Sequence, residues 1–531
     1  MEKTSIWGTK TVVYIFLSII TCFLGTWFAF LLAGLVDLVL ENNVEKLTFK
    51  ACMILGFLIV TYIVTYVQGR LKNALLKEKS CALRSEVFHE IFTYTVEEFQ
   101  GKNSAEYLNS ILSDCELIEE SYFQGMLSLI NQAVQLLIVC IAVIYTNVLM
   151  FGVMLVMAII TVAIMKMGND KIQSTMQAYA NTKESFSVFL KEKLGCFPLF
   201  SLYNVTDAVV KDFDVESNRV GVTKAEQKNE VLKKSCVAEF VGLGSTVIIM
   251  ATAVGLAMSG QLTAGFVIAS GQLIGKMISP LMVLPGTWAQ IKAAEPIKER
   301  LNSYFTAKEQ VDYIEIKELE KIKVEGVSFQ YPKSTQKILD NQTNCFEKGK
   351  RYLLKGESGR GKTTYLHLLG KMLSGYEGDI RLNNEVELRA CSGKSFFEQV
   401  GVITQKNYIF NGTLRENLCL YKDFKDEDVE KALEAASFEL QKEKFPEGID
   451  TVITEDGNNF SGGELQRIAL ARAFLHKFTW IFADEFTTGL DRKNAENVER
   501  ALLTAPNITV IAISHQDSPE FLALFDEIIE I

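Results

Sequence analysis

The stretch Gly356-Glu357-Ser358-Gly359-Arg360-Gly361-Lys362-Thr363-Thr364 lies between a short apolar run at 352–354 and an apolar helical pattern at 365–369. A strand that stops where a helix starts leaves backbone N–H groups pointing into one small concavity. The glycines let a phosphate chain approach this concavity without a Cβ in the way. The stretch therefore predicts a phosphate-binding loop. Taken alone, the pattern also fits a plain glycine-rich turn between a strand and a helix.

Charged and hydroxyl side chains at two places in the chain predict phosphate chemistry. Lys362 would reach the β- and γ-phosphates, and the Thr363 hydroxyl would bind Mg²⁺. Much further along, the apolar run 480–483 ends in Asp484 and Glu485. We expect Asp484 to hold Mg²⁺ through water, and Glu485 to act as the base that polarises the attacking water. An isolated Asp-Glu pair would predict only an exposed turn. The presence of a phosphate loop in the same chain favours the catalytic interpretation.

The amino-acid composition excludes several classes of protein. With 531 residues, 48% of them hydrophobic, and a positive mean hydropathy, the chain has room for two or three domains and is too apolar for a soluble enzyme. A net charge of −10 without a basic stripe argues against nucleic acid as a partner. The ten cysteines show no C-x-x-C pairing and are predicted to be reduced and structural. The N-terminal apolar run lacks a cleavage site and is predicted to remain as a membrane anchor.

Six apolar segments are predicted to span a membrane, because roughly 20 apolar residues cross a bilayer. They cover residues 11–40, 51–67, 126–145, 148–165, 237–258 and 264–291. Two long polar stretches, 70–120 and 166–235, carry many lysines and are expected in the cytoplasm. Their periodic sequence predicts that the membrane helices continue as rods beyond the bilayer.

Short β-type runs alternate with helical patterns from about residue 308 to the end, which predicts an α/β domain with a largely parallel sheet. The predicted fold is thus a multi-domain membrane protein. An all-α, six-span transmembrane domain with cytoplasmic helical extensions covers 1–307, a charged linker covers 308–321, and an α/β P-loop NTPase, the nucleotide-binding domain, covers 322–531.

A further motif, Phe460-Ser461-Gly462-Gly463-Glu464-Leu465-Gln466-Arg467, opens a predicted helix at 465–475. With Gln405 after one predicted strand, Gly489-Leu490-Asp491 after the carboxylates and His515 after the last core strand, the second half resembles the ATP-binding cassette of ABC transporters. The six-span half resembles the exporter-type transmembrane domain, so the resemblance covers nearly the whole chain. It implies an ATP hydrolase coupled to transport, in a half transporter of the bacterial peptide (bacteriocin) or multidrug type.

The resemblance also implies roles for single residues. Tyr331 would stack on adenine, although a strand aromatic in the core is the alternative. Gln405 would contact Mg²⁺ and the attacking water, and His515 would hold the γ-phosphate. The implied ATP contacts further include Gly356, Glu357, Ser358, Gly359, Arg360, Gly361, Lys362, Thr363, Thr364, Ser461, Gly462, Gly463, Glu464 and Asp491.

Some positions depart from the family pattern. The turn at 460–464 has Phe460 for the usual Leu and Glu464 for the usual Gln. We expect both to be tolerated, because Phe keeps the apolar anchor and a carboxylate suits the positive end of a helix dipole. In an acidic loop that would face the coupling helices, Thr454 and Asp456 replace the common Gly and Arg, which weakens the prediction of coupling there. Residues 97–103 and 194–200 resemble the two coupling-helix regions, but each also reads as an ordinary helix break.

One chain holds one cassette. In this family each ATP lies between the phosphate loop of one cassette and the signature turn of another, which is the turn at 460–464 in this chain. A homodimer is the simplest assembly, and a heterodimer with a similar half transporter is the alternative. The expected location is the cell membrane, with multiple spans in contact with lipid and the cassette in the cytoplasm. The motifs also fit an exporter-fold importer of the siderophore type or, less well, a membrane-anchored regulatory ATPase. The absence of an external receptor domain favours export.

Polar residues inside the predicted spans are the only indication of the substrate. They are Gln132, Gln135, Glu239 and Lys276. Charges in lipid are costly unless they face a cavity or a partner, so these are candidate functional residues. One charge of each sign would favour an amphipathic substrate such as a peptide. Alternatively, Glu239 and Lys276 lie near the membrane surfaces or pair with each other.

Overall fold

A computed structural model of the chain describes residues 7–40, 44–166, 169–305, 313–331, 334, 336–357, 359–404, 408–441, 443–454, 459–487 and 492–531. By their contacts, the residues form two compact units. The first comprises Met1–Phe92 and Ser104–Thr306, and the second comprises Thr93–Asn103 and Ala307–Ile531. The predicted limits at 307 and 322 stay predictions, and each unit is described by itself.

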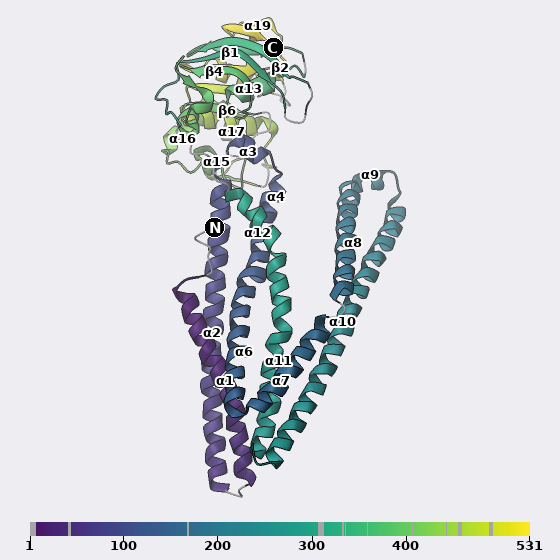
Figure 1. The fold of residues 1–531 in the computed structure, drawn as a ribbon. Coiled ribbons are helices and arrows are strands. Elements are labelled where there is room, and N and C mark those ends of the chain that lie inside the picture. The colour runs from purple at the N-terminus through teal and green to yellow at the C-terminus, as the bar shows by residue number, and fades with distance from the viewer. Residues whose placement is uncertain are drawn as a thin grey trace. The chain divides into compact units, whose positions relative to one another are not determined.

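The first unit consists of helices. Its long helices are α1 (Thr9–Leu40), α2 (Val44–Ile91), α6 (Gln124–Thr146), α7 (Val148–Lys166), α8 (Asn169–Gly195), α10 (Thr206–Met258) and α11 (Ala264–Ala293). The shorter ones are α4 (Ser104–Asn109), α5 (Cys115–Leu117), α9 (Phe197–Leu202) and α12 (Glu295–Asn302), with π-helical turns at Ser110–Asp114 and Ile118–Phe123 and a 3-10 turn at Ser303–Phe305. Helices α8 and α10 form a hairpin that α9 closes at its tip (Figure 1).

Several of these helices can cross a membrane, as predicted. Within the described residues, five are long and apolar enough: Thr9–Val39, Glu45–Ile91, Ser104–Thr146, Thr206–Met258 and Ala264–Phe305. The remaining apolar helix, Val148–Ile164, is shorter, so a crossing by this segment stays a prediction. The predicted continuation beyond the apolar segments is present, since α2 has 48 residues and α10 has 53.

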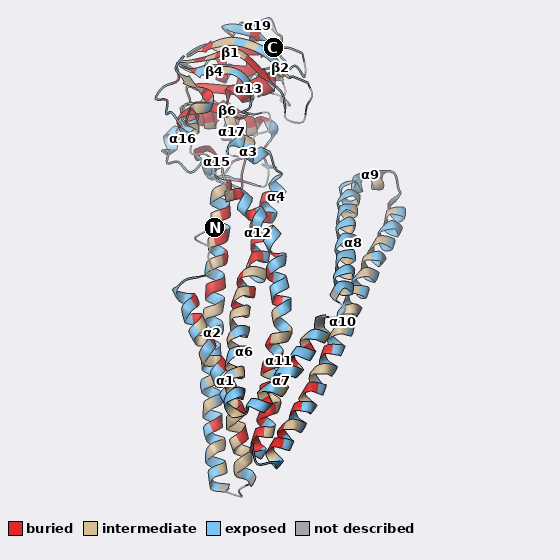
Figure 2. Cartoon of the chain, in the orientation of Figure 1, coloured by how far each residue is buried: buried red, intermediate tan, exposed pale blue. Residues whose placement is uncertain are grey.

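Burial in this unit fits a lipid environment. Most helix surfaces are exposed or half-buried (Figure 2), and the exposed side chains include many large apolar ones. A contiguous apolar surface of this kind is rare in soluble monomers and is expected where lipid covers it. The small buried cluster joins α6, α7, α10 and α11 through residues such as Val139, Met150, Ile249 and Leu273.

The second unit is an α/β domain, as predicted. A parallel five-stranded sheet has the order β11-β3-β10-β9-β6, a four-stranded antiparallel sheet has the order β2-β1-β4-β5, and β7 pairs with β8. The strands are β1 (Lys321–Phe329), β2 (Leu339–Glu347), β3 (Arg351–Lys355), β4 (Glu377–Leu382), β5 (Val386–Glu387), β6 (Val400–Ile403), β7 (Gly412–Thr413), β8 (Val452–Ile453), β9 (Trp480–Asp484), β10 (Thr509–Ile513) and β11 (Glu527–Glu530).

Helices surround these sheets. They are α3 (Val96–Gln100), α13 (Lys362–Leu369), α14 (Gly393–Phe397), α15 (Leu414–Cys419), α16 (Asp426–Ala435), α17 (Gly462–Leu475), α18 (Arg492–Leu503) and α19 (Pro519–Leu522). The separate antiparallel sheet was not predicted from the sequence. Its strand β2 is rich in polar residues and mostly not buried, so its hydrophobic pattern is weak.

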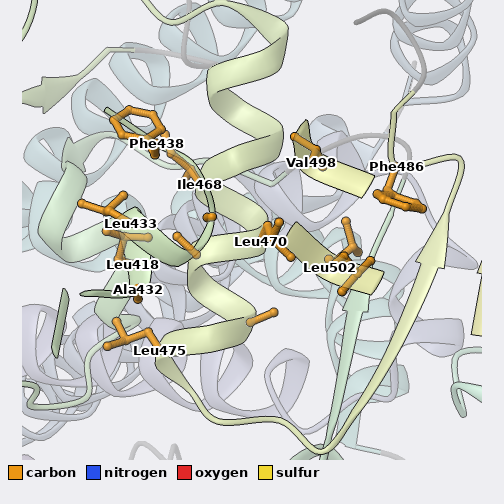
Figure 3. Packing of buried hydrophobic residues seen from close by; sticks show 14 of the residues in the cluster. Leu418, Ala432, Leu433, Phe438, Ile468, Leu470, Leu475, Phe486, Val498 and Leu502 are labelled. Atoms are coloured by element: carbon orange, nitrogen blue, oxygen red, sulfur yellow. The ribbon is translucent and has the colours of Figure 1, made fainter. Parts of the chain in front are cut away.

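The parallel sheet is buried on both faces. Successive residues of β9 point to opposite sides, so Trp480 and Phe482 belong to one hydrophobic cluster and Ile481 and Ala483 to the other. Every residue of β9 and β10 is buried, which explains their continuous apolar sequences. Figure 3 shows the cluster in which α17 packs with neighbouring helices.

The register of the parallel strands determines where the functional loops lie. Ile513 pairs with Leu354 of β3 on one side and with Asp484 of β9 on the other. The phosphate loop follows β3, Glu485 follows β9, and His515 follows β10. Since parallel strands end at the same edge, the three segments meet there.

Part of the predicted linker belongs to the second unit. Residues 306–312 lie outside the described residues, but Ile314 forms an isolated bridge with Cys391 and the side chain of Leu319 is fully buried. The backbone N–H of Leu319 also donates a 2.6 Å hydrogen bond to Gln399. The segment 313–320 is thus packed on the α/β unit.

Candidate functional site

Two glycines of the phosphate loop have backbone conformations that favour glycine. Gly359 and Gly361 have φ angles of +83° and +96°, a region that side chains with a Cβ rarely adopt. A Cβ on Gly361 would also lie 2.7 Å from Cγ2 of Ile338. Gly361 is the N-cap of α13, so the first free N–H groups of this helix face the loop. The arrangement is that of an anion site at a helix N-terminus.

Two side chains line this loop. Lys362 is buried, and its Nζ donates hydrogen bonds of 2.9 Å to the carbonyl oxygens of Gly356 and Glu357. The Tyr331 hydroxyl lies 3.2 Å from Oγ1 of Thr364. The Tyr331 side chain is 39% exposed, so a flat ligand can reach its ring, although one edge packs on the core. The structure therefore places Tyr331 beside the phosphate loop.

Oxygen atoms suitable for Mg²⁺ converge between α13 and β9. The Thr363 hydroxyl donates a 3.1 Å hydrogen bond to Oδ1 of Asp484. Burial raises the pKa of this carboxyl, while the bond from Thr363 and the nearby His367 act in the opposite direction. Mg²⁺ prefers hard oxygen ligands and commonly uses one or two carboxylates together with substrate phosphates. The two side chains therefore fit the ion.

Glu485 and His515 form a pair at the same edge of the sheet. Nε2 of His515 lies 2.9 Å from Oε1 of Glu485. Glu485 has a φ of +44°, an uncommon conformation for a residue other than glycine, and its N–H donates to the carbonyl oxygen of Ile513. Such strain persists only where the surroundings fix the backbone, and it concentrates at functional sites. The two segments are thus held side by side with the carboxylate and the imidazole in contact.

The signature turn begins α17. Ser461 is the N-cap, and its hydroxyl and the Glu464 side chain form a capping box. Glu464 Oε2 also accepts hydrogen bonds of 2.8 Å from both the N–H and the hydroxyl of Ser461, while Lys444 Nζ donates to the same carboxylate at 2.6 Å. Burial alone would raise the pKa of Glu464, but Lys444 and Ser461 lower it. The carboxylate is therefore stabilised in its ionised form.

Both departures of this turn from the family pattern have partners in the fold. Phe460 is buried and stacks on Phe445, with 5.4 Å between the ring centres. Glu464 pairs with Lys444, which directly precedes Phe445 in the sequence. Two adjacent residues therefore hold both ends of the turn, which gives a physical reason why the departures are tolerated.

Several predicted residues cannot be placed. Ser358, Gln405 and Asp491 lie outside the described residues, as does Asp456 of the predicted acidic loop. Their roles stay predictions.

The two predicted coupling regions coincide with short helices. In the second unit, Thr95 caps α3, and Ser374 N–H donates a 2.7 Å hydrogen bond to Glu97. In the first unit, α8 ends at Gly195 and α9 starts at Phe197. The helix breaks predicted at both places are present. Whether they couple the two units stays a prediction.

Two residues near this site were not predicted from the sequence. Lys444 lies in a segment without periodic pattern and gave no signal. Glu499 gave one, because it occupies an apolar face of α18 together with Val498, Leu502 and Leu503. An acidic residue at helical spacing among buried positions indicates a buried carboxyl.

Comparison with known proteins agrees with this geometry. Residues 11–281 match the family of the ABC transporter transmembrane region, and residues 339–488 match the ABC transporter family. The ATP-dependent lipid A-core flippase of Desulfotalea psychrophila (strain LSv54 / DSM 12343) is 24% identical, over 92% of this chain and 86% of that protein. The flippase of Escherichia coli (strain K12) is 22% identical, over 90% and 83%. The microcin-J25 export protein McjD of Escherichia coli is 36% identical, over 37% of this chain and 33% of that protein.

The transmembrane match covers about half of the chain, and the ATPase match covers the edge where the phosphate loop, Asp484 and Glu485 meet. A membrane unit and an ATPase unit on one chain make this a multi-pass membrane protein with a cytoplasmic ATPase domain, which hydrolyses ATP to drive export. The chain belongs to the ABC transporters, as an exporter-type half transporter.

Proposed function

We propose that the edge formed by β3, β9 and β10 is the site of ATP hydrolysis, with Glu485 as general base and His515 as the γ-phosphate contact. The observation that carries this proposal is the convergence of Lys362, the Thr363–Asp484 pair and the Glu485–His515 pair at one edge of a parallel sheet. Positioned charges of this kind perform most of the catalysis in phosphoryl transfer.

Each residue has a defined task in this proposal. The loop N–H groups and Lys362 bind the phosphates, and the Tyr331 ring stacks on the adenine. Thr363, Asp484 and Gln405 would hold Mg²⁺, which would neutralise charge on the β- and γ-phosphates. Glu485 takes a proton from the attacking water, and His515 keeps the carboxylate oriented and contacts the γ-phosphate.

We further propose that the working unit is a homodimer. Ser461 and Gly462 are exposed at the N-terminus of α17. The Gly462 N–H can face the γ-phosphate of a nucleotide bound to a second chain, and the Ser461 hydroxyl would turn from Glu464 to donate to the same phosphate. Since this chain carries both Lys362 and the signature turn, two identical chains complete two sites. ATP would favour the closed dimer, and hydrolysis would release it, so that the membrane unit would open alternately to the two sides of the membrane.

The proposed substrate is amphipathic and carries a polar or anionic group, as a peptide does. Three membrane helices contribute to a hydrogen-bonded polar cluster inside the first unit. The Gln68 amide donates to Ser18 at 2.7 Å and to Asn131 at 3.3 Å, and accepts from Thr21 at 3.0 Å. One turn further along α6, the side-chain nitrogen of Gln135 is buried and has no hydrogen-bond partner among the residues that the structure describes. Polar residues inside membrane-spanning helices are costly and are therefore candidates for contacting a substrate.

Lys276 of α11 lies close to this cluster. A Cβ on Gly25 would be 2.8 Å from its Nζ, so the ammonium group rests against α1 one turn from Cys22. Among the described residues, no acidic side chain pairs with Lys276, and Glu239 is exposed on α10. The ammonium group can therefore meet a carboxylate or phosphate of the substrate. Glu239 gives no matching support for a cationic group.

Vectorial transport in inverted membrane vesicles tests this proposal, with a panel of peptides, acidic lipids and cationic drugs. We expect ATP-dependent uptake of an anionic amphipath by the wild type, and loss of uptake and of substrate-stimulated ATPase activity in Lys276→Ala, with basal turnover kept. Lys292→Ala, exposed on the same helix, is the matched control. Transport of cationic drugs alone would contradict the substrate class, and ATP-driven movement out of the vesicles would indicate an importer.

A further inference from the structure

A buried carboxyl connects the two segments that carry Glu485 and His515. Glu499 of α18 is only 2% exposed, and its neighbours Val498 and Leu502 belong to the hydrophobic cluster shown in Figure 3. The mechanism proposed above does not use this residue. Burial of a carboxyl in an apolar cluster is unfavourable unless hydrogen bonds compensate for the lost water.

Two polar side chains, one from each catalytic segment, provide these bonds. The Thr487 hydroxyl, two residues after Glu485, donates to Oε1 of Glu499 at 3.2 Å. The Gln516 amide follows His515 directly, and with its nitrogen facing Glu499 it lies 2.7 Å from both carboxylate oxygens. One carboxyl group therefore accepts hydrogen bonds from both segments.

The same segments are joined on the side that faces the nucleotide site. Glu485 N–H donates to Ile513, and His515 contacts the Glu485 carboxylate. Further from the nucleotide site, Glu499 of α18 bonds side chains of both segments. Loss of the bonds to Glu499 would keep the backbone bond between Glu485 and Ile513, but it would free Thr487 and Gln516 at the far ends of the two segments.

We propose that Glu499 is a positioning residue, which holds the segments of Glu485 and His515 at the separation that hydrolysis requires by bonding Thr487 and Gln516 at once. The proposal rests on the proposed roles of Glu485 and His515. A misplacement of about 1 Å at a catalytic pair can reduce turnover strongly, without changing nucleotide binding. Glu499 touches neither reacting atoms nor phosphate in this arrangement.

Steady-state ATPase kinetics of the full-length transporter test the proposal. Glu499→Gln keeps the shape of the side chain but turns an amide NH₂ toward the amide of Gln516. We expect kcat to fall by about fivefold or more, the equivalent of one lost hydrogen bond, with KM for ATP changed by less than about twofold. Asn497→Ala, at an exposed position of the same helix, is the control and should leave kcat unchanged.

An exchange of the two side chains separates positioning from a general effect on packing. In Glu499→Gln/Gln516→Glu the amide again faces a carboxylate, and we expect kcat to return to within about twofold of the wild type. Unchanged kcat in the single variant, or a well-folded exchange variant that remains as slow as the single variant, would overturn the proposal.

Two further measurements keep the test decisive. If Glu499→Gln does not fold, Gln516→Met removes the link from the other side and should lower kcat in the same way, and an unchanged kcat there would refute the proposal. The variant Glu485→Gln tests the proposed role of Glu485 separately from the positioning role of Glu499. If that variant stays active, the proposed function has failed, whereas an inactive Glu485→Gln beside a fully active Glu499→Gln rejects the positioning role alone.

Discussion

At the scale of single residues, the proposed general base is Glu485, which combines a backbone φ of +44° with a direct contact to His515. We expect Glu485→Gln to bind ATP normally and to lose about 10²–10⁴-fold in turnover, because the amide cannot accept the proton from water. ATPase assays and nucleotide-dependent melting measure the two effects. Glu520→Gln, an exposed position on α19, serves as control. More than about a tenth of wild-type turnover in Glu485→Gln would show that another group is the base.

A second residue-scale prediction concerns pH and Glu499. Burial raises the pKa of its carboxyl to about 7 from an ordinary value of 4.5, with Glu496 contributing in the same direction and Thr487 opposing it. The folded state thus holds the proton more tightly than the unfolded state. The stabilising contribution is complete below the ordinary pKa and is lost as the pH rises through about 7.

The melting temperature of the full-length protein should therefore fall more steeply between about pH 5 and pH 8 in the wild type than in Glu499→Gln, by on the order of 5 °C. Differential scanning calorimetry at matched ionic strength measures the two slopes. The titratable groups on the neighbouring segments, Glu485, His515 and Asp517, are present in both proteins and cancel in the comparison. Equal slopes would contradict a raised pKa at Glu499.

At the scale of one element, the N-terminus of α17 is held by Lys444 through Glu464. Lys444→Met should lower ATPase activity by about fivefold, since a half-exposed ion pair that supports a cap contributes about 1 kcal/mol. In a Glu464→Gln background, the same substitution should have almost no effect, because the carboxylate is already gone. Kinetics of the four proteins form a double-mutant cycle. Additive effects would show that the two residues act independently.

The whole-molecule prediction concerns the dimer. A cysteine at Ser461 of one chain and a cysteine at Gly359 of the other should form a disulfide in the ATP-bound state, after the ten native cysteines are replaced. In the Glu485→Gln background, ATP should increase the crosslinked fraction on a non-reducing gel, since trapped nucleotide favours closure. Cysteine at Glu520, far from the signature turn in sequence, controls for random collision. Equal crosslinking with and without ATP would reject the shared nucleotide site.

Much of this protein follows from local sequence. Continuous apolar runs long enough for a bilayer predicted the membrane helices, and strand-loop-helix chemistry around 356–364 predicted the phosphate site, because both signals depend on neighbouring residues only. The capping box at Ser461 and Glu464 is equally local, since it joins residues one helical turn apart.

Tertiary structure decided what lies far apart in the chain. The bond from Thr363 to Asp484 and the contact of Glu485 with His515 depend on the parallel order β3-β10-β9, which no local pattern specifies. The antiparallel sheet was missed because β2 is mostly polar. The pairing of Lys444 with Glu464 and the link from Glu499 to Thr487 and Gln516 likewise arise only when separate segments pack together. Sequence periodicity reports whether a residue is buried, whereas its partner is set by the topology of the whole domain.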